Sequence, residues 1–353
     1  TEASILLGNL LWKQSRYDGA IQTLEKAHTL AQQQQNPKAQ ADSMSNLGAI
    51  FLYQGNLQIA ESYYSQSMAI YEQSGDRINM AGCLATLSAA YSETGEYRKA
   101  RQFAEQALKT CREAGYRRGE TIIQRNMGVD CIDLGDYISA KEFLTNALQM
   151  CQQLGDLWGE AISLDSLGLV KHADNHLESA LAYFEQAYQL QQGSGDERGR
   201  AYTLNHMAHV YLSQNKLSEA QEVFTKASNI REKIGEYQLK IDSDIGFAYI
   251  LLLQANQSEA FTTAHAILEQ IKQKGVDGIE HPIQVYLYCY KIFDAVGQTG
   301  DDLAVSLATE ALEVGYQLLM GRANKIKDVD LRTSFLQNIS FNREIHMLAN
   351  SKL

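Results

Sequence analysis

Residues 128–168 read GVDCIDLGDYISAKEFLTNALQMCQQLGDLWGEAISLDSLG and contain one complete period of the chain. A small residue opens the stretch at Gly128, others follow at Ala140 and Ala147, and Gly168 begins the next period 40 residues later. Large apolar residues stand between them three and four positions apart, which is typical of amphipathic helices. Small residues at fixed positions let two helices approach closely, so the period indicates a packed helix pair.

The same period extends over most of the chain. Alanine recurs every 40 residues at Ala20, Ala60, Ala100, Ala140, Ala180, Ala220 and Ala260. The small residue twelve positions earlier recurs as Gly8, Gly48, Ser88, Gly128, Gly168, Ala208 and Ala248, and a large apolar residue precedes each, beginning with Leu7. Glycine or asparagine stands where the turn inside a unit needs a left-handed backbone, at Gly55, Gly95, Gly135, Asn175 and Asn215. Only two prolines interrupt the chain, so we predict an all-α structure.

The composition bounds the possible functions. The 353 residues are 45% hydrophobic and 21% charged, which is enough apolar surface for a large core and argues against disorder. A net charge of −11 disfavours direct nucleic-acid binding. The longest apolar run, Ile245–Leu253, is about half as long as a membrane span, so no membrane partner is expected. Five cysteines without C-x-x-C spacing indicate free thiols in a reducing compartment, and we expect a cytoplasmic protein.

Residues 3–27 resemble a tetratricopeptide repeat (TPR) through Leu7, Gly8, Leu11, Tyr17, Ala20, Leu24 and Ala27, and the six following units match in phase. The usual repeat has about 34 residues. The longer repeat here is similar to those of bacterial signalling TPR proteins and kinesin-light-chain-like scaffolds. The resemblance implies an α-solenoid, a right-handed superhelix of helix pairs. Eight repeats are expected at about 1–36, 37–75, 76–115, 116–155, 156–195, 196–235, 236–275 and 280–314.

Beyond Gly315 the period is lost, and residues 315–353 are predicted to form capping helices, at Tyr316–Ile326 and Asp330–Leu348. The segment from Asp330 to Asn338 is similar to the ending of TPR regions in large bacterial regulators. Those regulators join a TPR sensor to a STAND-class ATPase or to another effector domain. At the other end, Glu2 already stands inside a first helix without capping residues, so we expect the chain to come from a longer polypeptide.

The TPR resemblance implies that first-helix positions line a concave groove. Carried over residue by residue, these positions give the predicted partner-binding residues Asn9, Trp12, Lys13, Tyr53, Glu93, Arg125, Asp133, Asp165, His172, Asn205, His209, Asp242 and Tyr249. This mixture of aromatic, amide and charged groups suits a peptide or protein segment held by several anchors. The alternative for each side chain is that it simply faces solvent. No catalytic residue, cofactor or resident metal is predicted, and the glycines around Gly195 lack the G-K-[ST] of a phosphate loop.

Three functions follow as hypotheses. The first is a non-catalytic sensor or scaffold that binds a protein or peptide segment and signals to an ATPase or effector domain of the same polypeptide. The second is a stand-alone peptide-pheromone receptor of the Rap type. The third and least favoured is a metal-dependent hydrolase, because His172 and His176 are four residues apart and His206 and His209 are three apart, with Asp165 nearby. Unit five is the least regular, since Lys171 replaces an apolar residue there and Asn175 a turn glycine, so it is a candidate hinge.

Overall fold

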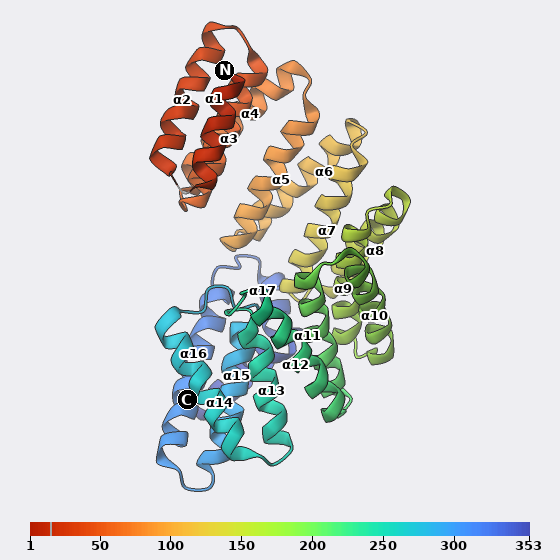
Figure 1. Cartoon of the computed structure of the whole chain (residues 1–353), viewed down its shortest axis with the longest axis vertical. Helices are drawn as coiled ribbons and strands as arrows, with labels where there is room; N and C mark the ends of the chain where they lie inside the picture. The colour runs from red at the N-terminus through yellow and green to blue at the C-terminus, as the bar shows by residue number, and fades with distance from the viewer. Residues whose placement is uncertain (15) are drawn as a thin grey trace. The chain divides into compact units, whose positions relative to one another are not determined.

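The computed structural model describes residues 1–14 and 16–353, with the side chain of Lys13 outside the described part. This part of the chain forms 18 α-helices and contains no strand, so the predicted all-α class is confirmed (Figure 1). The helices are α1 (Glu2–Lys13), α2 (Tyr17–Gln33), α3 (Pro37–Tyr53), α4 (Leu57–Ser74), α5 (Arg77–Glu93), α6 (Tyr97–Glu113), α7 (Arg117–Asp133), α8 (Tyr137–Leu154), α9 (Leu157–Ala173), α10 (Leu177–Ser194), α11 (Glu197–Ser213), α12 (Leu217–Lys233), α13 (Lys240–Leu253), α14 (Gln257–Lys274), α15 (Pro282–Gly297), α16 (Asp302–Ala323), α17 (Val329–Gln337) and α18 (Ser340–Lys352).

Turn and cap residues define the helix pairs as the sequence predicts. Asn175 and Asn215 adopt φ values of 59° and 57° in the turns that follow α9 and α11. Asp156 begins α9, and its side chain accepts a hydrogen bond from the backbone N–H of Gly159 at 3.1 Å. That bond satisfies one of the N–H groups that every helix start leaves without an intrahelical partner. The short turns fold the second helix of a pair back onto the first, in α1 and α2, α3 and α4, α5 and α6, α9 and α10, α11 and α12, α13 and α14, and α15 and α16 (Figure 1).

The small residues of the period are buried where two helices cross. The seven recurring alanines are at most 3% exposed. The glycines of the first helices face a large side chain of the second helix, because a Cβ atom on Gly168 would lie 2.5 Å from the ring of Phe184. At Gly128 the same construction places a Cβ 2.5 Å from Leu144. Glycine therefore creates the room that the opposing side chain occupies.

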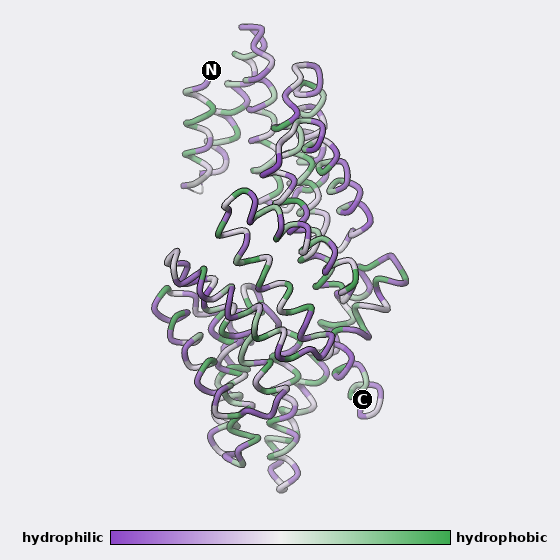
Figure 2. Tube along the Cα trace, turned by 90° about the vertical axis from the view of Figure 1, so that its right-hand side faces the viewer, coloured by the Kyte–Doolittle hydropathy of each residue, from purple (hydrophilic) through white to green (hydrophobic). Residues whose placement is uncertain are grey.

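The chain divides into two compact units, residues 1–127 and residues 128–353, and the division falls within α7. Along most helices of each unit, hydrophobic and hydrophilic residues alternate in the way that amphipathic helices require (Figure 2). Leu7 is an exception to the predicted core, since 49% of it is exposed, whereas Leu47 and Leu87 at the equivalent positions are buried. None of the described helices combines the length and the apolar character needed to cross a membrane.

The C-terminal helices differ from the sequence prediction in their boundaries. Gly315 does not end the eighth repeat, because α16 continues without a break to Ala323. It is a close-contact glycine, at which a Cβ atom would lie 2.5 Å from Ile345 of α18 and 2.9 Å from Tyr286 of α15. The stretch expected as one helix from Asp330 is split into α17 and α18.

The last two helices also reach back to the first turn of the second unit. The side-chain amide of Asn338 donates a hydrogen bond to the carbonyl of Gly135, between α7 and α8, at 2.9 Å. Gly135 has a φ of 71°, and a Cβ atom there would lie 2.7 Å from the carbonyl oxygen of Ser334. These helices therefore contact a repeat far away in the sequence.

Candidate partner-binding site

In the second unit, the first helices of successive repeats present polar side chains to one another. The hydroxyl of Thr203 on α11 donates to the carboxylate of Asp165 on α9 at 2.8 Å. One repeat further, the hydroxyl of Ser243 on α13 donates to the side-chain carbonyl of Asn205 on α11 at 3.0 Å. Both pairs are 38 residues apart, and each joins a predicted groove residue, Asp165 or Asn205, to a hydroxyl of the next first helix. We call this series of bonds between first helices the ladder.

The loop between α14 and α15 packs against this ladder. The backbone N–H groups of Glu280 and His281 donate to the two carboxylate oxygens of Asp242 at 3.0 and 3.1 Å. Asp242 is 5% exposed, and it anchors the loop. Sequence reasoning missed Glu280 and His281; the available signal was the break in the period between Gly275 and Pro282.

His206 lies between two carboxylates at the centre of the ladder. Its Nδ1 is 3.0 Å from Asp165, and its Nε2 is 3.4 Å from Glu280 on the loop. Burial opposes a charged imidazole, but the two carboxylates outweigh that effect and raise the pKa of His206 to about 10. The ring is therefore an imidazolium at neutral pH, with one charge-assisted contact to Asp165 on α9 and one to Glu280, which holds the loop.

Two neighbouring histidines have lowered pKa values instead. Burial lowers the pKa of His209 to about 3 and that of His172 to about 4, and the nearby histidines add to both shifts. The Nε2 atom of His172 is 2.9 Å from the hydroxyl of Ser213, and Nδ1 of His209 is 3.5 Å from the amide of Gln284. Both are neutral hydrogen-bonding groups on the inner face.

An aromatic stack ends the ladder. The rings of Tyr249 on α13 and Tyr288 on α15 are parallel within 7°, with centroids 4.3 Å apart. The ammonium of Lys291 lies 5.3 Å from the centroid of Tyr249 and is also 2.8 Å from a carboxylate oxygen of Glu344 on α18. This group combines an apolar platform with a positive charge, which is a suitable anchor for a peptide.

In the first unit, Tyr53 and Glu93 are the predicted groove residues that face solvent. Tyr53 is 69% exposed, and its ring stacks on Tyr17 with centroids 5.5 Å apart. Trp12 is half-buried and packs against the first hydrophobic cluster. Arg125 is only 6% exposed. The predicted contact Lys13 lies outside the described side chains.

The predicted residues thus differ in how accessible they are to a partner. Tyr53, Glu93 and Asp133 are exposed, whereas Arg125, Asn205 and Asp242 are buried. The others are half-buried: Asn9, Trp12, Asp165, His172, His209 and Tyr249. Asn205 and Asp242 hold repeats and loop together, so we remove them, with Arg125, from the expected direct contacts.

The histidine group considered for a metal assembles differently from the prediction. His176 is exposed at the start of α10, and neither His172 nor His209 joins a metal-ligand group within the described residues. The three potential ligands that do lie within 4.8 Å of one another are His206, Glu280 and His281.

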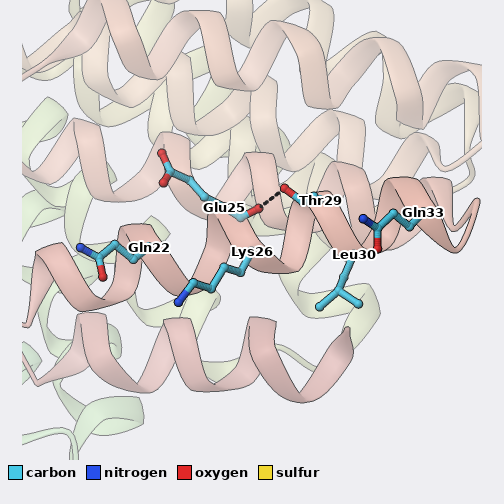
Figure 3. Close-up of a pocket in the computed structure, with 6 residues that line it drawn as sticks. All are labelled: Gln22, Glu25, Lys26, Thr29, Leu30 and Gln33. Carbon is cyan, nitrogen blue, oxygen red and sulfur yellow. Dashed lines mark hydrogen bonds between the residues drawn. The ribbon is translucent and has the colours of Figure 1, made fainter.

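A shallow depression on α2 offers no comparable chemistry (Figure 3). Its six lining residues all come from the exposed face of this one helix, as Gln22, Glu25, Lys26, Thr29, Leu30 and Gln33. The contact drawn among them is a local bond from the Thr29 hydroxyl to the backbone carbonyl of Glu25 at 3.0 Å. We therefore place the candidate site on the inner faces of the first helices.

Solved structures with this fold include signalling proteins. One is a signal transduction ATPase with numerous domains (STAND) and a tetratricopeptide repeat sensor from Pyrococcus horikoshii, with 19% identity, a TM-score of 0.62, and matches over 79% of this chain but only 43% of that one. The apo form of the quorum sensor NprR from B. thuringiensis has 16% identity and a TM-score of 0.62, over 91% of this chain and 86% of that one. The Rap conjugation gene regulator of the plasmid pLS20, solved with a Phr peptide, has 16% identity and a TM-score of 0.58, over 84% and 80%.

Sequence comparison agrees with the repeat pattern. The comparison with curated proteins found no match to this chain. The tetratricopeptide repeat family model matches residues 1–73 and 40–113, and the model of the MalT-like TPR region matches residues 81–285. These matches follow the helix pairs from α1 to the start of α15. The chain therefore belongs to the tetratricopeptide repeat family, and more than half of it is a MalT-like TPR region.

Proposed function

We propose that this chain is a non-catalytic sensor or scaffold that binds a protein or peptide segment along the inner faces of its first helices. The observation that carries the proposal is a row of half-buried side chains on successive first helices of the second unit, with Asp165 and His172 on α9, His209 on α11 and Tyr249 on α13. The buried hydrogen bonds of the ladder hold these helices in register, and an extended segment can contact several of the half-buried side chains at once.

The chemistry of the inner faces indicates the kind of segment. Tyr53 and the Tyr249–Tyr288 stack provide aromatic surface. His172 and His209 are neutral, with low pKa values, and they offer hydrogen bonds without charge. Exposed Glu93 adds negative charge, whereas desolvation of its carboxyl group and the neighbouring carboxylates of Asp130 and Glu280 raise the pKa of Asp133 to about 7, so that group is only partly ionised at neutral pH. These groups favour a segment with apolar anchors and some basic residues over a uniformly acidic tail.

The role as a sensor rests on relatives that carry an effector. The P. horikoshii protein combines a TPR sensor with a signal transduction ATPase, and this chain spans 43% of its length. By analogy, partner binding here would bias the curvature of the repeats and so act on an ATPase or effector domain of the same polypeptide in the cytoplasm.

A second candidate is a peptide-pheromone receptor of the Rap type. It is favoured by the match with a Rap regulator that was solved with a peptide, which extends over 84% of this chain. The two candidates share a peptide-binding inner face and differ in what responds to it. A separately encoded target would support the Rap type, and a covalently linked ATPase would support the sensor.

The experiment is to isolate a binding partner by pull-down and titrate it against matched variants. Tyr249→Ala and Tyr53→Ala should each weaken binding by more than about 1 kcal/mol, because aromatic anchors concentrate binding energy. Lys226→Ala is the control, since Lys226 is exposed on the second helix α12 and pairs only locally, with Glu222 at 2.6 Å. If only the Lys226 change reduced affinity, the inner-face assignment would be wrong.

A further inference from the structure

The loop between α14 and α15 brings two metal-binding side chains to a histidine of α11. One potential ligand atom from each of His206, Glu280 and His281 lies within 4.8 Å of the other two. A carboxylate oxygen of Glu280 is 3.4 Å from Nε2 of His206 and 3.8 Å from Nε2 of His281. Ligand atoms around a tetrahedral zinc ion are about 3.3 Å apart when each metal–ligand distance is about 2.0–2.1 Å. The Glu280 oxygen is already within about 0.5 Å of this separation from both histidine nitrogens, and no pair of the three atoms has to approach by more than about 1.5 Å to bind an ion.

The histidine on α11 is already oriented for coordination. A carboxylate oxygen of Asp165 lies 3.0 Å from Nδ1 of His206, on the far side of the ring from Glu280. Without an ion both ring nitrogens carry a proton, and an ion binds by displacing the proton from Nε2, which is the ring nitrogen nearer Glu280. Asp165 then still accepts the Nδ1–H bond and fixes the tautomer in which Nε2 is the ligand atom. The arrangement of carboxylate, histidine and metal is the usual way in which proteins fix a ligating imidazole.

The other two ligands are held by the backbone. Asp242 accepts hydrogen bonds from the N–H groups of both Glu280 and His281, at 3.0 and 3.1 Å. Pro282, the first residue of α15, follows directly and restricts the chain there. The loop thus presents both side chains in a fixed position, which lowers the entropy lost when an ion binds.

The surrounding charge suits a divalent cation. Three carboxylates, Asp165, Asp242 and Glu280, gather around the group. Two arginines also act on the group: Arg231, whose guanidinium pairs with Glu236 and lies over the ring of Tyr202, 3.9 Å from its centroid, and Arg322, which adds to the lowering of the pKa of His281 by burial. The carboxylates of Asp165 and Glu280 are the charges in direct contact with the two histidines, and they favour a positive ion.

We propose that His206, Glu280 and His281 form a site for a divalent transition metal, zinc first among them. Two imidazoles and one carboxylate are a donor set suited to zinc and poorly suited to magnesium or calcium. The side chains of Glu280 and His281 are 20% and 29% exposed, so an ion can enter from the loop side. Three protein ligands leave a fourth position open to water or to a group of a bound partner. The site is independent of whether the inner face binds a peptide.

The test uses tag-free protein treated with a chelator, because an affinity tag of histidines would bind the same ions. Cobalt(II) is added while visible absorption reports four-coordinate binding, and zinc is then titrated in competition. The wild-type chain should bind one ion with micromolar or tighter affinity. Asp165→Asn should weaken binding by about 10–100-fold, because it removes the group that orients a ligand. Glu280→Gln and His281→Gln should weaken it at least as much.

The matched control is His176→Gln, which changes an exposed histidine at the start of α10 and should leave affinity unchanged. Circular dichroism of each variant checks that the helices are intact, and the two loop variants keep the test valid if a change at His206 unfolds the chain. The proposal is refuted if no saturable binding of cobalt or zinc occurs. It is equally refuted if Glu280→Gln and His281→Gln bind as tightly as the wild type, since the group would then be only an ion-pair network.

Discussion

Replacing Gly168 by alanine tests whether close helix packing defines the repeat. A Cβ atom there would lie 2.5, 2.7 and 2.8 Å from three ring carbons of Phe184. Carbon atoms normally approach to about 3.5–4.0 Å, so the ring or the helix has to move by about 1 Å. Phe184 is fully buried, and such overpacking costs about 1–3 kcal/mol. Removing a helical glycine returns about 1 kcal/mol, so we expect a net loss of up to about 2 kcal/mol.

The matched control is Gly82→Ala. Gly82 is also inside a first helix, α5, but an added Cβ would meet no atom within 4 Å. This variant should therefore gain about 1 kcal/mol from helix propensity alone. The difference between the two variants isolates the packing cost, and we expect it to be about 1–3 kcal/mol.

The assay is urea unfolding followed by circular dichroism, with midpoints compared directly because repeat arrays do not always unfold in two states. A double variant tests whether contact with the Phe184 ring is the cause of the destabilisation. In a Phe184→Ala background the ring is absent, so adding Gly168→Ala should become stabilising rather than destabilising. If Gly168→Ala unfolds at the same urea concentration as Gly82→Ala, or if Phe184→Ala does not reverse its sign, the close contact does not limit this position.

Three further predictions concern packing, backbone strain and pH. Ala140→Leu should destabilise the chain by about 1–3 kcal/mol because Ala140 is fully buried. Gln149→Leu, on the exposed face of the same helix, should change stability by less than about 0.5 kcal/mol, and thermal melts of the two variants measure the difference. Ala255→Gly should stabilise by about 1 kcal/mol in urea unfolding, because Ala255 adopts a left-handed φ of 63°, while the same change at Ala182 in helix α10 should cost about 1 kcal/mol. Burial holds the pKa of His209 near 3, so the unfolded chain binds a proton below pH ~6.5 that the folded chain excludes. The wild type should accordingly lose stability relative to His209→Gln as pH falls from about 6.5 toward 4, and parallel curves for the two proteins would contradict this.

The repeat itself could be predicted from the sequence because its physical causes are local. Small residues recur at one spacing, and glycine or asparagine recurs where the turn needs a positive φ, as Asn175 and Asn215 confirm. The role of a single glycine is harder to predict from the sequence. The sequence predicts a separate helix from Tyr316, directly after Gly315, whereas Gly315 lies inside α16 and packs against Ile345, which stands thirty positions later and becomes its neighbour only in the folded chain.

The sequence predicts which helix faces form the candidate site, but it does not predict which residues on those faces a partner can reach. The family pattern correctly places Asp165, Asn205 and Asp242 on adjoining first helices. It does not show that the loop carrying Glu280 would fold onto Asp242 and bury it, because that loop lies outside the period. How far a groove side chain is exposed to solvent depends on such irregular segments, so the repeat pattern alone does not determine it.

The bond between Asn338 and Gly135 has a consequence for how the second unit folds. The inner-face bonds of the ladder join residues about one repeat apart, whereas this one spans 203 residues. A solenoid with only neighbour contacts can fold from any repeat and grow outward. A contact of such high sequence separation instead carries a large loop-closure entropy and forms late, after the intervening helices are in place. Folding of the second unit is therefore expected to end with the closure of this contact between its first turn and its last helices.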